Sequence, residues 1–350
     1  MAYHFWFTNT CSIVKTKVNI PQCMQPWDIK SMPINEGSTS KSSGRLEQLK
    51  RFLALSRTPH GLMDMATPAF AVLLYLGSFP PVHVVIIGMM TAFAGYTAVY
   101  ALNDIIDYRT DMAKGGESAL TAETYLDSLM IRHPMAQGLL TYRQGIMWVT
   151  GWSLVALMGA YILNPICVVI FLIGTALETI YCLLWRVSPW RSVISGFVKN
   201  SGPVAALFAV DPHPAPFFAV LLFLGLFFWE IGGQNILADW TDKDLAQGLH
   251  AKTIPIMLGV QKSASLVLIT LTGATVLMIF LFWLYSPIWE WVAALAAAIT
   301  CFYLLLIPGI KLYLAQDRDH AMALFNKASY FPLVLLGIVL GLISVMQGFK

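Results

Sequence analysis

The sequence reads Asn103-Asp104-Ile105-Ile106-Asp107-Tyr108-Arg109-Thr110-Asp111 directly after an apolar run that starts near Pro81. If a helix continues through this stretch, Asn103, Asp107 and Asp111 recur every four residues and share one face. Asp104 lies three residues before Asp107 and joins the same acidic face. Such carboxylates repel one another unless a cation binds, and Mg²⁺ usually takes one or two carboxylates together with substrate phosphate. We therefore expect a diphosphate site with Asn103, Asp104, Asp107 and Asp111 as metal ligands.

A second polar stretch, from Trp229 to Asp244, also closes an apolar run. Asn235 and Asp239 are four residues apart and Asp242 follows three residues later, so a continuous helix places all three on one face. The same helix would turn Asp244 away from that face. We expect Asn235, Asp239 and Asp242 to be metal ligands, so that two acidic helix ends hold two or more Mg²⁺ ions around one diphosphate.

The composition is that of an integral membrane protein. Of 350 residues, 57% are hydrophobic and only 12% are charged, which is too apolar for an ordinary soluble domain. Nine runs are long enough to cross roughly 30 Å of hydrocarbon. They lie at residues 60–79, 81–103, 143–163, 165–185, 192–210, 215–238, 263–285, 288–308 and 329–347. The pattern predicts an all-α membrane protein with about nine transmembrane helices.

Lys and Arg residues gather on one side of these spans. The short loops at residues 80–81, 164–165, 211–214 and 286–287 contain neither residue type, whereas the other loops and the segment before the first span contain many. The positive-inside rule then places the N-terminus and both acidic stretches in the cytoplasm and the C-terminus outside. The formal net charge of +3 reflects this orientation and gives no indication of nucleic-acid binding.

The chain divides into a polar tail at residues 1–45 and a membrane domain at residues 46–350. The tail lacks helical periodicity and cannot bury a core, so we expect it to be disordered. A short amphipathic helix is expected from Leu46 to Leu55, and another helix around Ala119 to Ile131. The five cysteines form no CxxC pair, so neither a zinc site nor a disulfide framework is indicated.

Several polar side chains are candidates for contact with an anionic substrate, and each has a simpler alternative. Arg57 before the first span is either a substrate contact or a membrane anchor. Lys199 inside the fifth span either meets a phosphate or extends to the membrane surface. Lys114 and Arg132 flank a long polar loop that is able to close over a diphosphate, although isolated cations are as often simply solvated. The full set of substrate-contact candidates is Arg57, Lys114, Arg132, Tyr181, Lys199 and Lys252.

Over about residues 50–347 the sequence resembles the UbiA superfamily of intramembrane prenyltransferases. The first acidic stretch matches that family's Asn-Asp-x-x-Asp-x-x-x-Asp motif. The segment Arg132 to Gly138 is similar to its Arg-Pro-Leu-x-x-Gly element, and Lys252 to Pro255 is similar to its Lys-Thr-Leu-Pro element. The resemblance implies helices around a central cavity, a cytoplasmic cap and Mg²⁺ held by both acidic motifs. It also implies release of a diphosphate and capture of the resulting allylic cation by an acceptor.

Two positions depart from the family pattern. Ala246 occupies the place of a further Asp in the second motif, with Asp244 as a possible substitute. His133 stands where the family commonly has Arg before a proline. A weaker second metal site fits a specialised member, including the membrane terpene cyclases of the same superfamily.

The leading interpretation is Mg²⁺-dependent transfer of a prenyl group to a small lipophilic acceptor such as an aromatic or quinone precursor, with turnover depending most on Asp104, Asp107 and Asp239. The alternative is cyclisation of a prenyl diphosphate without an acceptor. An ion-coupled transporter is a third possibility, because intramembrane Asp, Glu and Lys residues also mark ion pathways. A transporter, however, needs charges near the middle of the bilayer, whereas the acids here cluster at one surface. Prenyl chain length and acceptor identity are left open by the sequence.

Overall fold

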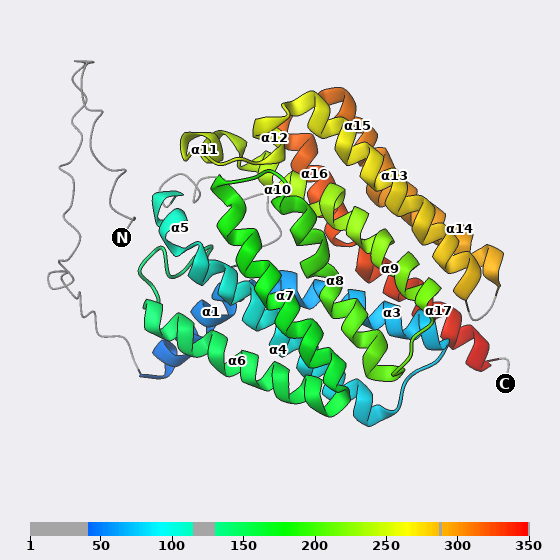
Figure 1. Cartoon of the computed structure of the whole chain (residues 1–350). Coiled ribbons are helices and arrows are strands. Elements are labelled where there is room, and N and C mark those ends of the chain that lie inside the picture. The colour runs from blue at the N-terminus through cyan, green and yellow to red at the C-terminus, as the bar shows by residue number, and fades with distance from the viewer. Residues whose placement is uncertain (1–40, 115–129, 287–288, 349–350) are drawn as a thin grey trace, which may run out of the picture.

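The computed structural model describes residues 41–114, 130–286 and 289–348, and within these ranges every regular element is helical (Figure 1). The α-helices are α1 Lys41–Leu55, α2 Thr58–Asp64, α3 Ala66–Leu76, α4 Val82–Ile106, α5 Tyr108–Lys114, α6 Tyr142–Leu163, α7 Pro165–Leu183, α8 Arg191–Val210, α9 Pro216–Trp229, α10 Ile236–Thr241, α11 Lys243–Gly248, α12 Ile254–Met257, α13 Val260–Tyr285, α14 Glu290–Cys301, α15 Ile307–Ala315, α16 Arg318–Ser329 and α17 Phe331–Gly348. A 3₁₀ turn at Leu184–Arg186 extends α7. Two π-helical turns, Glu230–Asn235 and Phe302–Leu306, join α9 to α10 and α14 to α15.

Among the described residues, eight continuous helical stretches are long and apolar enough to cross a membrane. They are Val82–Ile106, Tyr142–Leu163, Pro165–Arg186, Arg191–Val210, Pro216–Thr241, Val260–Tyr285, Glu290–Ala315 and Arg318–Gln347. The prediction of an all-α membrane fold is confirmed. The count of nine is not confirmed, because the first predicted span, 60–79, is divided into the short helices α2 and α3.

The division of the first span has a local cause at Pro68. Proline has no amide hydrogen, so Pro68 cannot donate to the Asp64 carbonyl as a helical residue would. The Thr67 hydroxyl donates to that carbonyl instead, at 2.8 Å. The helix is therefore interrupted at Met65, between α2 and α3.

The predicted division into a tail and a membrane domain can be compared with the structure from residue 41 onward. Helix α1 begins at Lys41, so the predicted tail of residues 1–45 extends too far into the ordered chain at its end. Residues 1–40 lie outside the described part of the chain, as does most of the helix expected around 119–131. The expected helix from Leu46 to Leu55 is confirmed as the larger part of α1.

The helices pack around a cavity of about 710 Å³. Helix α4 packs on α6 and α7, α7 packs on α8, and α3 packs on α8 and α17, so these elements enclose the cavity from several sides (Figure 1). A tightly packed cluster around Trp229, Phe218 and Phe282 holds the second half of the chain together and joins it to α3. The central cavity expected from the sequence is therefore present.

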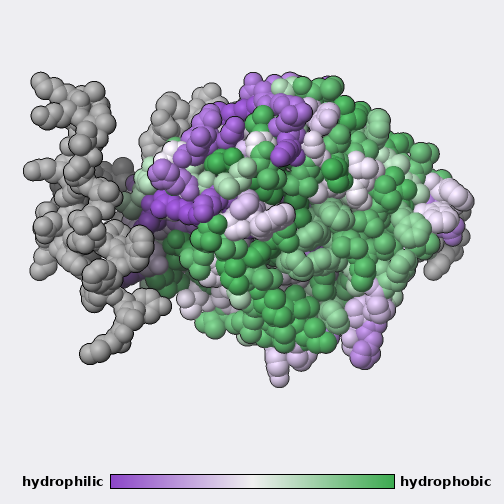
Figure 2. Space-filling view, turned by 45° about the horizontal axis from the view of Figure 1, so that its top comes forward, coloured by the Kyte–Doolittle hydropathy of each residue, from purple (hydrophilic) through white to green (hydrophobic). Residues whose placement is uncertain are grey.

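The outer surface agrees with a membrane environment. Figure 2 shows hydrophobic side chains over most of the visible face, with hydrophilic side chains gathered mainly along one end. Large apolar side chains such as Met147, Leu154 and Trp291 are exposed on the outside of the spans. A soluble protein rarely exposes so much contiguous apolar surface, whereas lipid covers it at no cost.

Candidate metal and diphosphate site

The first acidic stretch keeps helical spacing although α4 formally ends at Ile106. The Asp107 amide donates to the Asn103 carbonyl at 2.9 Å, and the Asp111 amide donates to the Asp107 carbonyl at 2.8 Å. Helical hydrogen bonds therefore continue from the end of α4 into α5. The four polar side chains consequently lie along one arc of the helix, as the sequence spacing predicted.

That arc faces two different neighbours. At one edge, the Asn103 amide donates to Glu178 Oε1 of α7 at 2.7 Å, and Asp107 lies within electrostatic range of Cys182 and Arg191. At the other edge, Asp104 and Asp111 face the segment that contains His133. Asn103 and Glu178 line the cavity, so the Asn103 edge is the one that meets a substrate inside it.

Asp104 and Asp111 are both buried beside cations. Arg57 lies 3.1 Å from Asp104 Oδ1, and His133 Nδ1 lies 3.3 Å from the same oxygen and 3.0 Å from Asp111 Oδ2. Burial alone would lower the pKa of the His133 imidazole, but the two carboxylates outweigh burial and raise its pKa above the ordinary value. Arg57 thus lies at the acidic motif, as its candidate role requires.

The second acidic stretch does not form the continuous helix that its spacing suggested. A π-helical turn covers Glu230–Asn235, α10 ends at Thr241, and Asp242 adopts a non-helical backbone with φ −101° and ψ 13°. The prediction that Asn235, Asp239 and Asp242 share one helical face is therefore wrong for Asp242. Arg318 stabilises the break, because its Nε donates to the Thr241 carbonyl at 2.8 Å.

Asn235 and Asp239 instead face α7 and α8. The Asn235 amide donates to the Tyr181 hydroxyl at 2.9 Å, and Arg191 donates to Asp239 Oδ1 at 2.6 Å. The Arg191 guanidinium also lies over the Tyr181 ring, 4.4 Å from its centre. The buried Asn235 Oδ1 accepts no hydrogen bond from the described chain. An orphaned amide oxygen beside carboxylates is a suitable ligand for Mg²⁺, so these residues fit that ion.

Asp242 is half-buried and turns toward the loop before α6. Arg132 lies 3.5 Å from its Oδ2 atom, so the Arg132–Asp242 contact joins the segment after the first motif to the second motif. Arg132 therefore contacts the second acidic motif, whereas the adjacent His133 contacts the first.

The structure also changes the interpretation of Asp244 and Ala246. Asp244 is exposed on α11, while Ala246 is buried beside Trp185 and Ala251. An Asp at position 246 would therefore enter an apolar cluster and would not join Asp239 and Asp242. The place of the family's further Asp is therefore not part of the acidic site in this chain.

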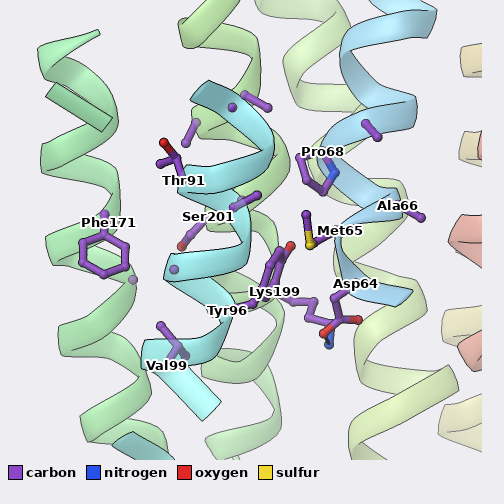
Figure 3. A pocket seen from close by; sticks show the side chains of 18 of the residues that line it. Asp64, Met65, Ala66, Pro68, Thr91, Tyr96, Val99, Phe171, Lys199 and Ser201 are labelled. Atoms are coloured by element: carbon purple, nitrogen blue, oxygen red, sulfur yellow. Dashed lines mark hydrogen bonds and ion pairs between the residues drawn. The ribbon is translucent and has the colours of Figure 1, made fainter. Parts of the chain in front are cut away.

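Lys199 does not lie at the acidic motifs. Its side chain lies beside Asp64 at the cavity (Figure 3), and its ammonium donates to Asp64 Oδ2 at 2.6 Å. The ammonium also donates to the Tyr100 hydroxyl at 3.1 Å. The Tyr100 hydroxyl also donates to Asp64. The ammonium is thus held by a carboxylate of the chain and does not extend to the membrane surface in this structure.

The remaining substrate-contact candidates differ in what the structure shows of them. Tyr181 lines the cavity and accepts the Asn235 hydrogen bond. The Lys252 side chain is exposed, and its backbone amide donates to the Trp185 carbonyl at 2.9 Å. Lys114 ends α5, and its side chain lies outside the described set.

Sequence reasoning missed three groups at this site. Arg191 is one of the Lys and Arg residues of the loops that indicate orientation, yet it pairs with Asp239 inside the protein. His133 was noted only as a departure from a motif. Glu230, buried in the π-helical turn, accepts a hydrogen bond from Ser195 at 2.6 Å and lines the cavity. Ion pairs and hydrogen bonds between distant helices leave no local signal in the sequence. Glu230 is the exception, because an acidic residue within an apolar run is a signal that could have identified it.

The cavity connects the polar end to apolar walls deeper in the membrane domain. Asn103, Glu178 and Asn235 line one part, and Phe79, Val84 and Leu163 line another. Phe79 follows α3, Val84 lies in the first turn of α4 and Leu163 ends α6, so this apolar part lies at the opposite end of α4 from the first acidic motif. The space is therefore suited to a ligand with an anionic head and a hydrocarbon tail.

Comparison with known proteins supports this geometry. A model of the UbiA prenyltransferase family matches residues 65–333. No curated protein gives a significant match. Among solved structures, a UbiA homologue from Aeropyrum pernix K1 aligns with 17% identity and a TM-score of 0.66, covering 81% of this chain and 97% of that one.

Two further structures show the same fold. A UbiA homologue from Archaeoglobus fulgidus, bound to GPP and Mg²⁺, aligns with 14% identity and a TM-score of 0.63, covering 84% of this chain and 99% of that one. A digeranylgeranylglyceryl phosphate synthase aligns with 18% identity and a TM-score of 0.60, covering 85% and 98% of the two chains. At these identities the structural matches establish a shared fold.

Proposed function

The chain belongs to the UbiA prenyltransferase family, and we propose that it transfers a prenyl group from a prenyl diphosphate to a small lipophilic acceptor within the membrane. The observation that carries the proposal is that Asn103 of the first motif and Asn235 of the second both line one cavity whose other walls are largely apolar. The A. fulgidus homologue of the same fold binds GPP and Mg²⁺ in its solved structure. An anionic head at the acids and a prenyl tail along the apolar wall would match that arrangement.

Asn103, Asp107, Asn235 and Asp239 are the residues we propose to hold Mg²⁺ near the cavity, with Asp104, Asp111 and Asp242 as further ligands of the two motifs. When bound, Mg²⁺ supplies positive charge that stabilises a departing diphosphate. The binding of anionic substrate oxygens is assigned to Arg57, Arg132 and Arg191, because each already lies beside an acid of the motifs. Lys252 and Lys114 remain candidates at the same surface.

The cavity walls contribute by excluding water. A developing allylic cation survives long enough to meet an acceptor only where water cannot reach it. Phe171, Val99 and Met65 line the cavity beyond its polar end (Figure 3). We propose that these apolar side chains hold the prenyl tail and shield the reacting carbon.

The decisive test is incubation of the purified protein in detergent with Mg²⁺ and labelled dimethylallyl, geranyl and longer prenyl diphosphates. Each reaction is run with and without a membrane lipid extract as the acceptor pool. Prenylated product that requires the extract and is lost with EDTA supports transfer. Cyclic hydrocarbon or alcohol formed without the extract would instead support the cyclase alternative, and no turnover of any diphosphate would contradict both.

The structure gives different expectations for the two acids that follow α10. Asp242→Asn should lower turnover at least tenfold, about 1.4 kcal/mol of transition-state stabilisation, because it loses charge beside Arg132. Asp244→Asn should stay within a few-fold of wild type, because Asp244 is exposed. Steady-state rates at saturating Mg²⁺ measure both variants. A severe Asp244 defect beside a mild Asp242 defect would show that Asp244 is the ligand.

Orientation is a separate prediction that rests on the distribution of Lys and Arg. A tag at residue 1 should be protected from protease in right-side-out vesicles, and a tag after Lys350 should be accessible. Both acidic motifs would then face the cytoplasm. The reverse labelling pattern would overturn this orientation, and the acidic motifs would then lie on the opposite side of the membrane.

A further inference from the structure

We propose that Asp104, Asp111 and His133 form a binding site for a divalent transition-metal ion such as Mn²⁺, Co²⁺ or Zn²⁺. This site shares Asp104 and Asp111 with the first acidic motif, but it lies at the edge of the motif that faces His133, whereas Asn103 faces the cavity. It does not rest on prenyl transfer, because it stands on the identity and spacing of the three ligand atoms. It assigns a direct role to the one residue that departs from the family pattern beside the first motif.

The spacing of the three ligand atoms suits one small cation. His133 Nδ1 lies 3.3 Å from Asp104 Oδ1 and 3.0 Å from Asp111 Oδ2, and one ligand atom from each residue lies within 4.8 Å of the others. Adjacent ligands of an octahedral ion with bonds of about 2.1 Å are about 3.0 Å apart. The observed separations therefore need little adjustment to bind an ion.

The direction of the imidazole supports the same conclusion. His133 Nδ1 is buried and forms no well-aligned hydrogen bond within the described chain, although two carboxylate oxygens lie near it. A nitrogen that served only as a hydrogen-bond donor would point at one of those oxygens. Nδ1 is instead close to both without being aligned with either, as a ligand to an ion lying between them would be.

The ligand types decide the class of metal. Two carboxylate oxygens alone favour Mg²⁺ or Ca²⁺, whereas an added imidazole nitrogen favours first-row transition ions. Arginine, which commonly occupies this position in UbiA-like sequences, has no lone pair to offer a metal. The change from Arg to His therefore replaces a fixed positive charge with a potential ligand.

The charges around the three residues permit a divalent ion. Asp104 and Asp111 carry two negative charges, and Arg57 supplies one positive charge at Asp104. With a neutral imidazole the site keeps a net negative charge, which a divalent cation offsets. A metal-bound His must be neutral, so binding is expected to release a proton when the imidazole is charged beforehand.

The backbone holds the imidazole in place. His133 has a left-handed conformation with φ 51°, and its carbonyl accepts the Gln137 amide at 3.2 Å. The next residues, Pro134 and Met135, are buried, and Met135 packs in a small apolar cluster with Leu140. Asn tolerates the left-handed region better than most residues. His133→Asn therefore replaces the nitrogen ligand with an amide at little backbone cost.

The test uses tag-free full-length protein with substoichiometric Mn²⁺ and pulsed EPR. Wild type should show electron-spin-echo modulation from a directly coordinated ¹⁴N nucleus. His133→Asn and His133→Arg should both lose it, and Asp111→Asn should weaken or lose it. His320→Asn, which removes a histidine paired with Asp317 on α16, is the matched control and should leave the signal unchanged.

Metal affinity gives a second readout that needs no turnover. In calorimetric titrations, His133→Asn should weaken Zn²⁺ or Co²⁺ binding at least about tenfold while Mg²⁺ binding changes less than about threefold. Absence of nitrogen modulation in wild type, or its persistence in His133→Asn, would overturn the proposal. Loss of prenyl transfer with the nitrogen signal intact would count against the proposed function alone.

Discussion

Alanine in place of Asp104, Asp107 or Asp239 is expected to reduce turnover of a prenyl diphosphate by at least about 10²- to 10³-fold, the scale observed when one preorganised charge contact is lost. Each change removes a carboxylate from an acidic motif without opening the helical core. Asp107 and Asp239 are both electrostatically coupled to Arg191, so they act on the same region of the site. Activity is measured with labelled diphosphate at saturating Mg²⁺.

Folding must be separated from chemistry in this experiment. The three variants should still elute from size-exclusion chromatography in detergent as folded protein, although Asp239→Ala should lower the thermal unfolding midpoint because it leaves the buried Arg191 without its Asp239 partner. Asp319→Ala, which removes an exposed acid on α16, is the control and should keep wild-type activity. Rates like wild type in any two of the three motif variants would contradict the proposed diphosphate site.

Lys199→Met is expected to destabilise the folded protein by about 3–5 kcal/mol, the usual cost of leaving one member of a buried ion pair without its partner. Asp64 is buried, the Lys199 side chain is only 13% exposed, and the two lie 2.6 Å apart, so the substitution leaves the Asp64 carboxylate beside the cavity without a lysine partner. The thermal unfolding midpoint in detergent should fall markedly.

The double variant Asp64→Asn/Lys199→Met tests whether the unpaired Asp64 charge causes the loss of stability. Removing both charges should recover most of the lost stability, because no uncompensated charge remains in the protein. If Lys199 instead held a phosphate, the single variant would keep its unfolding midpoint and lose only affinity for the diphosphate. That result would move Lys199 back among the substrate contacts.

Local sequence pattern correctly predicted the features that depend on a single helix. A chain crossing hydrocarbon must satisfy every backbone polar group within its own segment, so apolar runs of sufficient length predicted helices in eight of nine cases. The spacing of Asn103, Asp107 and Asp111 likewise held, because the amides of Asp107 and Asp111 kept their helical bonds. The exception was the first predicted span, 60–79, which is divided near Met65. Its cause is also local, because Pro68 lacks an amide donor, but the length of an apolar run gives no information about such a break.

Local pattern failed where the outcome depended on neighbours. Asp242 left the helix of Asn235 and Asp239, and Arg318 stabilised the Thr241 carbonyl that the break exposed. That arginine is 77 residues away in sequence. The burial of Ala246 could likewise not be predicted from local pattern, because it depends on packing in the cluster with Trp185.

The sequence by itself determined the membrane class, the helical spacing of the first motif and the family, because each follows from composition or from residues a few positions apart. Only the tertiary structure decided which charges meet. Arg191 and Asp239 are 48 residues apart, Arg132 and Asp242 are 110 apart, and Lys199 and Asp64 are 135 apart. Coulomb energy depends on distance in space and on burial, neither of which the order of residues fixes. The tertiary structure therefore pairs Lys199 with Asp64 beside the cavity and places Arg191 against Asp239 of the second acidic motif.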